Sequence, residues 1–257
     1  MSGRAVVTIA GDVVLKRHAP GSDAALLAAQ LAVAGAEPWS TVLLAPLAPS
    51  PVAAPSGDLL TLWPRVAALA PGDPDLPWAE AGEILARLHT LPVPPLQPHG
   101  GAARLARALR AAAALPADAA ALLRPLASEL LRRWPAPTAS DRLVHGDFHL
   151  GQLGRTPTGA LVLFDLDDLG LGHPAWDLGR LAGFHAAGIL PDRDWAAFVA
   201  GYTRGGGRWP AGGAGSPLDH AARAAVVIGA VREASGHSDD TAGALLAACA
   251  RMAQWRL

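Results

Sequence analysis

The sequence predicts an α+β fold with a small N-terminal β-sheet lobe and a larger helical C-terminal lobe. Short β-prone segments with turn signals between them fill the first part of the chain, and long alanine- and leucine-rich segments dominate from Trp78 onward. Between the two parts, residues 64–77 contain the run PGDP, which cannot sustain regular structure. We therefore expect one lobe over residues 1–66 and a second lobe over residues 67–257.

The N-terminal lobe is expected to contain a small sheet and one helix. Its strands are predicted at residues 5–10, 13–17, 41–47 and 59–63. Gly11 and Asp12 lie between the first two strands and are a strong signal for a two-residue hairpin turn. Residues 23–34 are rich in alanine and leucine, and Ser22 or Asp23 can cap their N-terminal end, so this segment predicts a helix.

The C-terminal lobe is expected to be helical except for one pair of strands. Helices are predicted at residues 79–91, 102–115, 117–134, 176–187, 192–202, 220–235 and 239–256. The two strands are predicted at residues 142–144 and 160–164, with a turn at residues 156–159. We expect these strands to form a hairpin with acidic residues at two ends.

Composition excludes several classes of protein. Lys and Arg number 21 and Asp and Glu 22, for a formal charge of -1, and there is no basic block that could follow a nucleic-acid backbone. Cys249 is the only cysteine, so an intrachain disulfide and a cysteine-based zinc site are both excluded. No apolar run approaches the roughly 20 residues that span a bilayer, and the N-terminus lacks a signal-peptide pattern. We expect a cytoplasmic protein that binds neither nucleic acid nor membrane.

Polar side chains follow both strands of the predicted hairpin. His145, Asp147 and Gln152 follow the first strand, and Asp165 follows the second. A magnesium-nucleotide phosphotransfer site needs one carboxylate near the acceptor hydroxyl and further oxygen ligands for the metal. Asp147 and Asp165 can divide these roles, and Gln152 can add an amide oxygen to the metal shell. His145 can hold the catalytic loop through hydrogen bonds.

The second acidic segment offers one more metal ligand. Asp165, Asp167 and Asp168 follow one another closely after the second strand. If strand geometry continues there, Asp165 and Asp167 project to the same side and Asp168 points away, because side chains alternate along a strand. Asp167 is therefore a candidate magnesium ligand together with Asp165.

Three motifs in order give this chain a family resemblance. HGDFHLGQ at residues 145–152 is followed by DLDD at residues 165–168 and GHPAWDL at residues 172–178, and LARLH precedes them at residues 85–89. This pattern resembles the aminoglycoside phosphotransferase superfamily, which also contains kinases for choline, homoserine, fructosamine and maltose. The HLGQ ending most resembles that of maltokinase-like members.

The resemblance implies a protein-kinase-like fold whose two lobes meet at an ATP cleft. It also implies an ATP- and magnesium-dependent phosphotransferase that acts on a hydroxyl of a small molecule, such as an aminoglycoside, a sugar or an amino alcohol. By this resemblance Asp147 is the catalytic base or orients the acceptor, and Gln152 and Asp165 are magnesium ligands. Asp177, at the start of a helix, is expected to anchor the loop.

The same resemblance assigns nucleotide-binding residues in the N-terminal lobe. Lys16 corresponds to the strand lysine that contacts the α- and β-phosphates, and Trp63, Arg65 and Val66 belong to the interlobe hinge that meets the adenine. The lobe departs from the family pattern, because it lacks a glycine-rich phosphate loop. Its helix also lacks a glutamate to pair with the lysine and offers only Asp23 and Gln30 as polar candidates.

These departures leave two alternatives open. A pseudokinase would bind nucleotide or another ligand without turnover. A metal-dependent phosphohydrolase would use His145, Asp147, His149 and Asp165 as ligands of a transition metal. Acidic residues near the C-terminal helices would favour a polyamine acceptor if they lined its site. They are Asp192, Asp194, Asp219, Glu233, Asp239 and Asp240.

Overall fold

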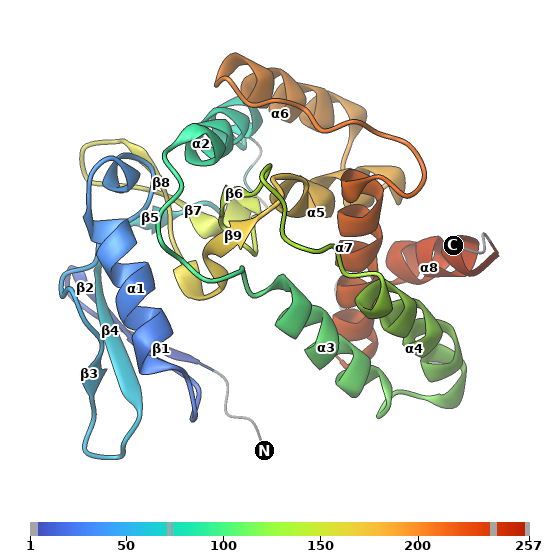
Figure 1. Ribbon diagram of the computed structural model, residues 1–257, viewed down its shortest axis with the longest axis horizontal. Coiled ribbons are helices and arrows are strands. Elements are labelled where there is room, and N and C mark those ends of the chain that lie inside the picture. The colour runs from blue at the N-terminus through green and yellow to red at the C-terminus, as the bar shows by residue number, and fades with distance from the viewer. Residues whose placement is uncertain (1–4, 71–72, 74, 237–240, 255–257) are drawn as a thin grey trace.

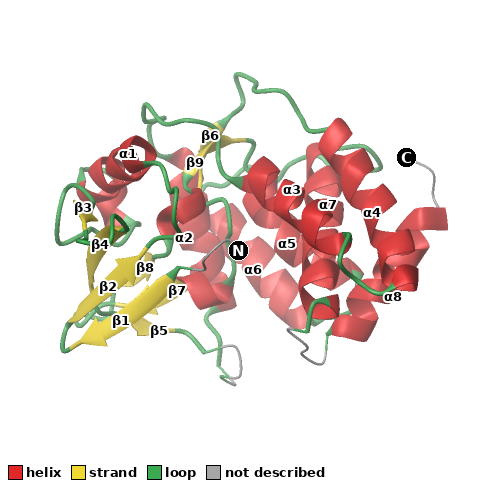
Figure 2. Ribbon diagram, turned by 90° about the horizontal axis from the view of Figure 1, so that it is seen from below, coloured by secondary structure: helices red, strands yellow, loops and turns green. Residues whose placement is uncertain are grey.

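The computed structural model describes residues 5–70, 73, 75–236 and 241–254, which have the predicted α+β architecture. A small antiparallel sheet lies at one end of the molecule and a group of helices at the other (Figure 1). A view from below shows the strands gathered on one side and the helices packed together on the other (Figure 2). A sheet-containing N-terminal part and a helical C-terminal part are therefore both present.

The N-terminal sheet has four antiparallel strands in the order β1-β2-β4-β3. These strands are β1 (Val6–Ala10), β2 (Val13–Arg17), β3 (Val52–Ala53) and β4 (Leu59–Pro64). The strands predicted at residues 5–10, 13–17 and 59–63 are confirmed, and β3 is an additional short strand. Lys16 pairs with Val7 on one side and with Thr61 on the other, so it lies within the sheet.

One helix, α1 (Ala24–Gly35), follows the first hairpin as predicted. Asp23 is its N-cap, because the carboxylate accepts hydrogen bonds from the N–H groups of Ala25 (2.8 Å) and Leu26 (3.1 Å). The helix turns Gln30 into the protein, where this side chain is buried. The polar residue on the inner side of α1 is therefore an amide and not a carboxylate.

The strand predicted at residues 41–47 is wrong. Trp39–Thr41 form a 3-10 turn, and the segment after it makes one isolated parallel bridge, between Leu43 and Leu163. Leu43 and both of its neighbours are buried, and Pro46 has no N–H group with which to continue a ladder. This apolar segment is a buried connection between the two parts of the molecule.

The acidic hairpin is present, but its first strand is not the predicted one. β7 (Leu153–Arg155) pairs with β8 (Leu161–Leu163) across the turn at residues 156–159, whereas β6 (Arg142–Val144) pairs with β9 (Gly170–Gly172). The chain turns twice between β6 and β7, so β6 cannot continue into the hairpin. The loop with Asp147 therefore leaves β6, and the acidic segment connects β8 to β9.

Every helix predicted for the C-terminal part is present. They are α2 (Trp78–Thr90), α3 (Gly101–Ala112), α4 (Ala117–Arg132), α5 (Ala175–Ala186), α6 (Asp192–Arg204), α7 (Pro217–Ala234) and α8 (Ala242–Gln254). α7 begins earlier than predicted, because Ser216 accepts a hydrogen bond from the Asp219 N–H and Pro217 takes the first helical position. Residues 239–240 and 255–256 of the last predicted helix lie outside the described residues.

Two hydrophobic cores hold the molecule together. The first joins Val33 and Leu43 of the N-terminal part to Ile84 of α2, Phe148 of the catalytic loop and Leu163 of β8. The second lies among α3, α4, α7 and α8. The first core crosses between the two parts, and the lobe boundary at residue 66 stays a prediction. Within the part of the chain that the structure describes, no helix is long and apolar enough to cross a membrane.

Candidate active site

A buried carboxylate holds the loop that carries His145, Gly146 and Asp147. Asp177, in the first turn of α5, accepts hydrogen bonds from the backbone N–H groups of His145 (2.7 Å) and Gly146 (2.9 Å). Its Oδ2 also lies 3.0 Å from Nε2 of the buried His89. Burial alone would raise the pKa of Asp177, but these hydrogen bonds hold that pKa below its usual value. The anchoring role predicted for Asp177 is confirmed, and the sequence did not indicate the role of His89.

Gly146 brings this loop against the acidic segment after β8. Its φ of 86° lies in the left-handed region, and a Cβ at this position would collide with the backbone carbonyl of Asp168. The ring of His145 is fully buried, and its Nε2 lies 2.9 Å from the backbone oxygen of Phe164. His145 therefore joins the two loops from within, as the sequence suggested.

Asp147 contacts two arginines that the sequence analysis missed. Arg104 of α3 lies 2.9 Å from one oxygen of Asp147 and also pairs with Asp168, and Arg180 of α5 lies 3.5 Å from the other oxygen of Asp147. Burial raises the pKa of Asp147, and the two arginines only partly oppose this shift. Arg180 follows Asp177 by three residues on one helix, so it could have been placed near the loop. Nothing in the sequence around Arg104 identifies it.

Lys16 reaches from the N-terminal sheet to the acidic segment. It is the only lysine in the chain, and its ammonium group pairs with Asp165 and lies 2.7 Å from Oδ1 of Asp167. Burial lowers the pKa of Lys16, but the two carboxylates more than compensate and raise it. Burial raises the pKa of Asp165, and the interaction with Lys16 outweighs it, so the pKa is lowered. One buried cation thus bridges the two parts of the molecule.

The acidic segment does not continue as a strand. Asp165 adopts a left-handed backbone conformation with φ of 62°, and Leu166–Asp168 form a 3-10 turn. Asp165 and Asp167 still face the same cation, whereas Asp168 faces Arg104. The predicted sides are therefore correct, but the predicted strand geometry is wrong. A strained backbone at such a position is common in functional sites.

Gln30 of α1 supports the acidic segment from behind. Its amide nitrogen donates to the backbone oxygens of Asp167 (3.1 Å) and Leu169 (2.9 Å). Its own oxygen is buried and has no hydrogen-bond partner among the described residues. Gln30 therefore does not replace the missing glutamate as a partner of Lys16, because the two aspartates take that place.

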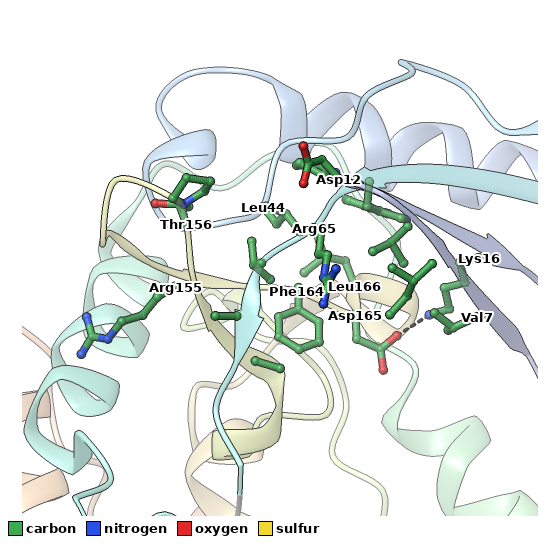
Figure 3. A pocket seen from close by; sticks show the side chains of 18 of the residues that line it. Val7, Asp12, Lys16, Leu44, Arg65, Arg155, Thr156, Phe164, Asp165 and Leu166 are labelled. Carbon is green, nitrogen blue, oxygen red and sulfur yellow. Dashed lines mark hydrogen bonds and ion pairs between the residues drawn. The ribbon is translucent and has the colours of Figure 1, made fainter.

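The predicted nucleotide-binding residues line a cleft of about 860 Å³. Lys16, Trp63, Arg65 and Val66 are part of this lining, with apolar side chains of β1 (Figure 3). Figure 3 shows Lys16 and Asp165 on one side of the cleft, joined by their ion pair. Asp167 also lines the cleft, whereas His145, Asp147 and Gln152 are not among its lining residues. Gln152 is connected to it, because its amide nitrogen donates to Asp165 (2.9 Å).

The donor groups suit magnesium better than a transition metal. Asp165 and Asp167 already converge on one cationic group, and the amide of Gln152 lies beside them. Magnesium is usually held by one or two carboxylates together with substrate phosphates. Among the described residues, no three His, Cys, Asp or Glu side chains come together as metal ligands. The phosphohydrolase alternative therefore gains no support, and burial lowers the pKa of His149 to about 3.

Solved structures of kinases share this architecture. The amicoumacin kinase hAmiN, in complex with AMP-PNP, Ca²⁺ and Ami, is similar with a TM-score of 0.64 and 14% identity, over 96% of this chain and 87% of that chain. A thermostable mutant of aminoglycoside phosphotransferase APH(4)-Ia is similar with a TM-score of 0.63 and 12% identity, over 97% and 90%. A choline/ethanolamine kinase family protein from Mesorhizobium loti gives 0.55 and 20%, over 98% and 86%. At these identities the likeness shows the fold.

The family is established by the sequence itself. No curated protein matches this sequence significantly. The model of the phosphotransferase enzyme family, APH, matches residues 3–218, which include the sheet, the cleft and both acidic loops. With its protein-kinase-like fold and this match, the chain belongs to the APH phosphotransferase enzyme family.

Proposed function

We propose that this protein transfers the γ-phosphoryl group of ATP to a hydroxyl group of a small molecule, with magnesium as its metal cofactor. The observation that carries the proposal is the bridge between Lys16 and the pair Asp165 and Asp167. It brings the single lysine of the N-terminal sheet to two carboxylates at the edge of a large apolar-walled cleft. Phosphotransferases need this combination of cationic and oxygen-ligand groups.

The cleft can hold the nucleotide. Apolar side chains of β1, together with Trp63 and Val66, offer a surface for the adenine, and Lys16 offers a positive charge for the phosphates. Asp165, Asp167 and Gln152 would hold magnesium, which neutralises negative charge on the phosphates when it is bound. Two solved relatives support this assignment, since one is described in complex with AMP-PNP and Ca²⁺ and another with ADP.

Asp147 is the proposed catalytic base. Burial raises its pKa, which makes its carboxylate a better proton acceptor. The acceptor oxygen bonds to the γ-phosphorus as the bond to the bridging oxygen breaks, ADP leaves, and the hydroxyl proton passes to Asp147. His145, Gly146 and Asp177 position this carboxylate through the hydrogen bonds of its loop. Positioning supplies most of the catalysis expected in such transfers.

Two substitutions separate chemistry from binding. We expect D147N to lower kcat by about 10²- to 10⁴-fold, the usual contribution of a general base, with nucleotide affinity preserved. D165N should abolish magnesium-dependent ATP binding, because it removes a metal ligand and the partner of Lys16. Calorimetry with ATP, with and without magnesium, measures binding, and ATP consumption over a panel of hydroxyl compounds measures turnover. D118N, an exposed aspartate of α4, is the matched control.

The same measurements test the pseudokinase alternative. Magnesium-dependent ATP binding without turnover on any acceptor would favour that alternative, and normal turnover by D147N would refute the role of Asp147. A maltokinase-like or aminoglycoside acceptor stays a prediction from the motifs alone. A mass-spectrometric screen for a phosphate-sized mass gain over sugars, amino alcohols and aminoglycosides tests both.

A further inference from the structure

The catalytic carboxylate lies between two arginines from different helices. Arg104 comes from α3 and Arg180 from α5, and each pairs with a different oxygen of Asp147. Their side chains are 26% and 30% exposed, so a ligand at Asp147 can reach both. The charged groups that face the proposed acceptor position from these helices are therefore positive.

The acidic residues that could attract a polyamine are occupied elsewhere. Asp192 pairs with His185 (2.8 Å), Asp194 with Arg193 (3.2 Å) and Asp219 with Arg223 (2.8 Å). Asp239 and Asp240 lie outside the described residues. In the part of the chain that is described, no ion pair joins any of these three aspartates to the arginines around Asp147.

Arg104 has unused hydrogen-bonding capacity. It contacts both Asp147 and Asp168 through Nη2, while its Nε is buried and has no hydrogen-bond partner among the described residues. A guanidinium group has five N–H donors in a fixed fork that fits a carboxylate or a phosphate. When an acceptor hydroxyl binds Asp147, it competes for the oxygen that Arg104 now contacts. An anionic group on the acceptor would restore a partner for the displaced guanidinium.

We infer that the acceptor is a hydroxyl compound with an anionic group, a carboxylate or a phosphate, close to the hydroxyl that is phosphorylated. Arg104 and Arg180 determine this specificity by binding the anionic group. The inference rests on the proposed phosphotransfer function and names the acceptor class for that site. A polyamine would instead place positive charges against two guanidinium groups, which is unfavourable in a partly buried site.

Matched sets of acceptors test the inference. One set is gluconate, glucose and glucosamine, another is glycerate, glycerol and 3-aminopropane-1,2-diol, and glucose 6-phosphate and glycerol phosphate separate phosphate from carboxylate recognition. We expect kcat/KM to be highest for the anionic member of a set and lowest for the amine. R104Q and R180Q should each reduce the preference for the anion by about 10- to 100-fold, mainly through KM, because a charge-assisted hydrogen bond is lost. R104K should keep part of it.

R107Q is the control, since Arg107 lies on the exposed side of the same helix and should leave the preference unchanged. Preference for the amine, or an equal loss of kcat with every acceptor in R104Q, would overturn the inference while leaving phosphotransfer intact. If no acceptor turns over, calorimetry of the same sets in the presence of magnesium and AMP-PNP decides it. Equal binding of acid, neutral compound and amine would then overturn the inference, whereas loss of magnesium-dependent nucleotide binding would refute the proposed function.

Discussion

At the scale of single residues, the protonation state of Asp147 reflects a balance between burial and charge. Burial raises the pKa of this carboxyl, and Arg104 and Arg180 act in the opposite direction. A general base works only when it is deprotonated, so activity is lost as the pH falls through that pKa. The arginines therefore extend the active range toward acid pH, whatever else they bind.

This balance predicts how the pH profile shifts on mutation. R104Q removes one cation that lowers the pKa of Asp147, so that pKa should rise further and the acidic limb of kcat/KM should move to higher pH. Measurement of kcat/KM against pH with a neutral acceptor checks this, because such an acceptor has no charge of its own for Arg104 to bind. R107Q should keep the wild-type profile. An unchanged limb in R104Q would show that Asp147 does not set it.

At the scale of elements, α1 supports the proposed metal-binding segment through Gln30. The two hydrogen bonds from its amide to the backbone of the segment fix Asp167 and its neighbours. Q30M keeps a similar volume but removes both donors. We expect the dissociation constant for magnesium-ATP to rise by about 10-fold, because two buried carbonyl groups lose their partners and the segment loosens.

Calorimetry with magnesium-ATP measures this effect, and the KM of the acceptor should change much less. A32Q, at an exposed position of the same helix, is the control for a change in α1 that does not touch the segment. Wild-type nucleotide affinity in Q30M would show that other contacts hold the acidic segment in place.

The sequence predicted elements well where local patterns decide the structure. The Gly11-Asp12 turn, the Asp23 cap and the periodic apolar helices are local signals, and each is present. The hairpin was assigned the wrong first strand because pairing of β6 with β9 joins segments far apart in the chain, and no local pattern specifies that register. Residues 41–47 resemble a strand in composition, but tertiary packing buries them as an irregular segment.

The candidate site divides in the same way. Asp147, Asp165 and Lys16 could be named from short motifs and the family resemblance, and the structure places Lys16 against Asp165. Arg104 could not be named, because its position at the catalytic loop depends on how α3 packs against that loop. The partners of Lys16 were also missed in part, since the contact with Asp167 depends on a 3-10 turn that strand periodicity does not predict.

At the scale of the whole molecule, the two parts share one core. Val33 and Leu43 of the N-terminal part pack with residues of α2, β8 and the catalytic loop. The ion pair between Lys16 and Asp165 makes a second connection across the cleft. Because these contacts would have to break together, we expect one cooperative unfolding transition for the chain, seen alike by tryptophan fluorescence and by far-UV circular dichroism.

Nucleotide binding should then stabilise the whole chain and not one lobe. At a magnesium-ATP concentration about 100 times its dissociation constant, binding contributes about 2.7 kcal/mol, which should raise the Tm by about 5–10 °C for a chain of this size. D165N should lose this shift and D118N should keep it, since only Asp165 contacts Lys16 and the proposed metal. Two separate transitions, of which only one responds to magnesium-ATP, would show that the N-terminal sheet folds independently of the helices. A full shift with ATP in the absence of magnesium would remove the metal from the proposed binding site.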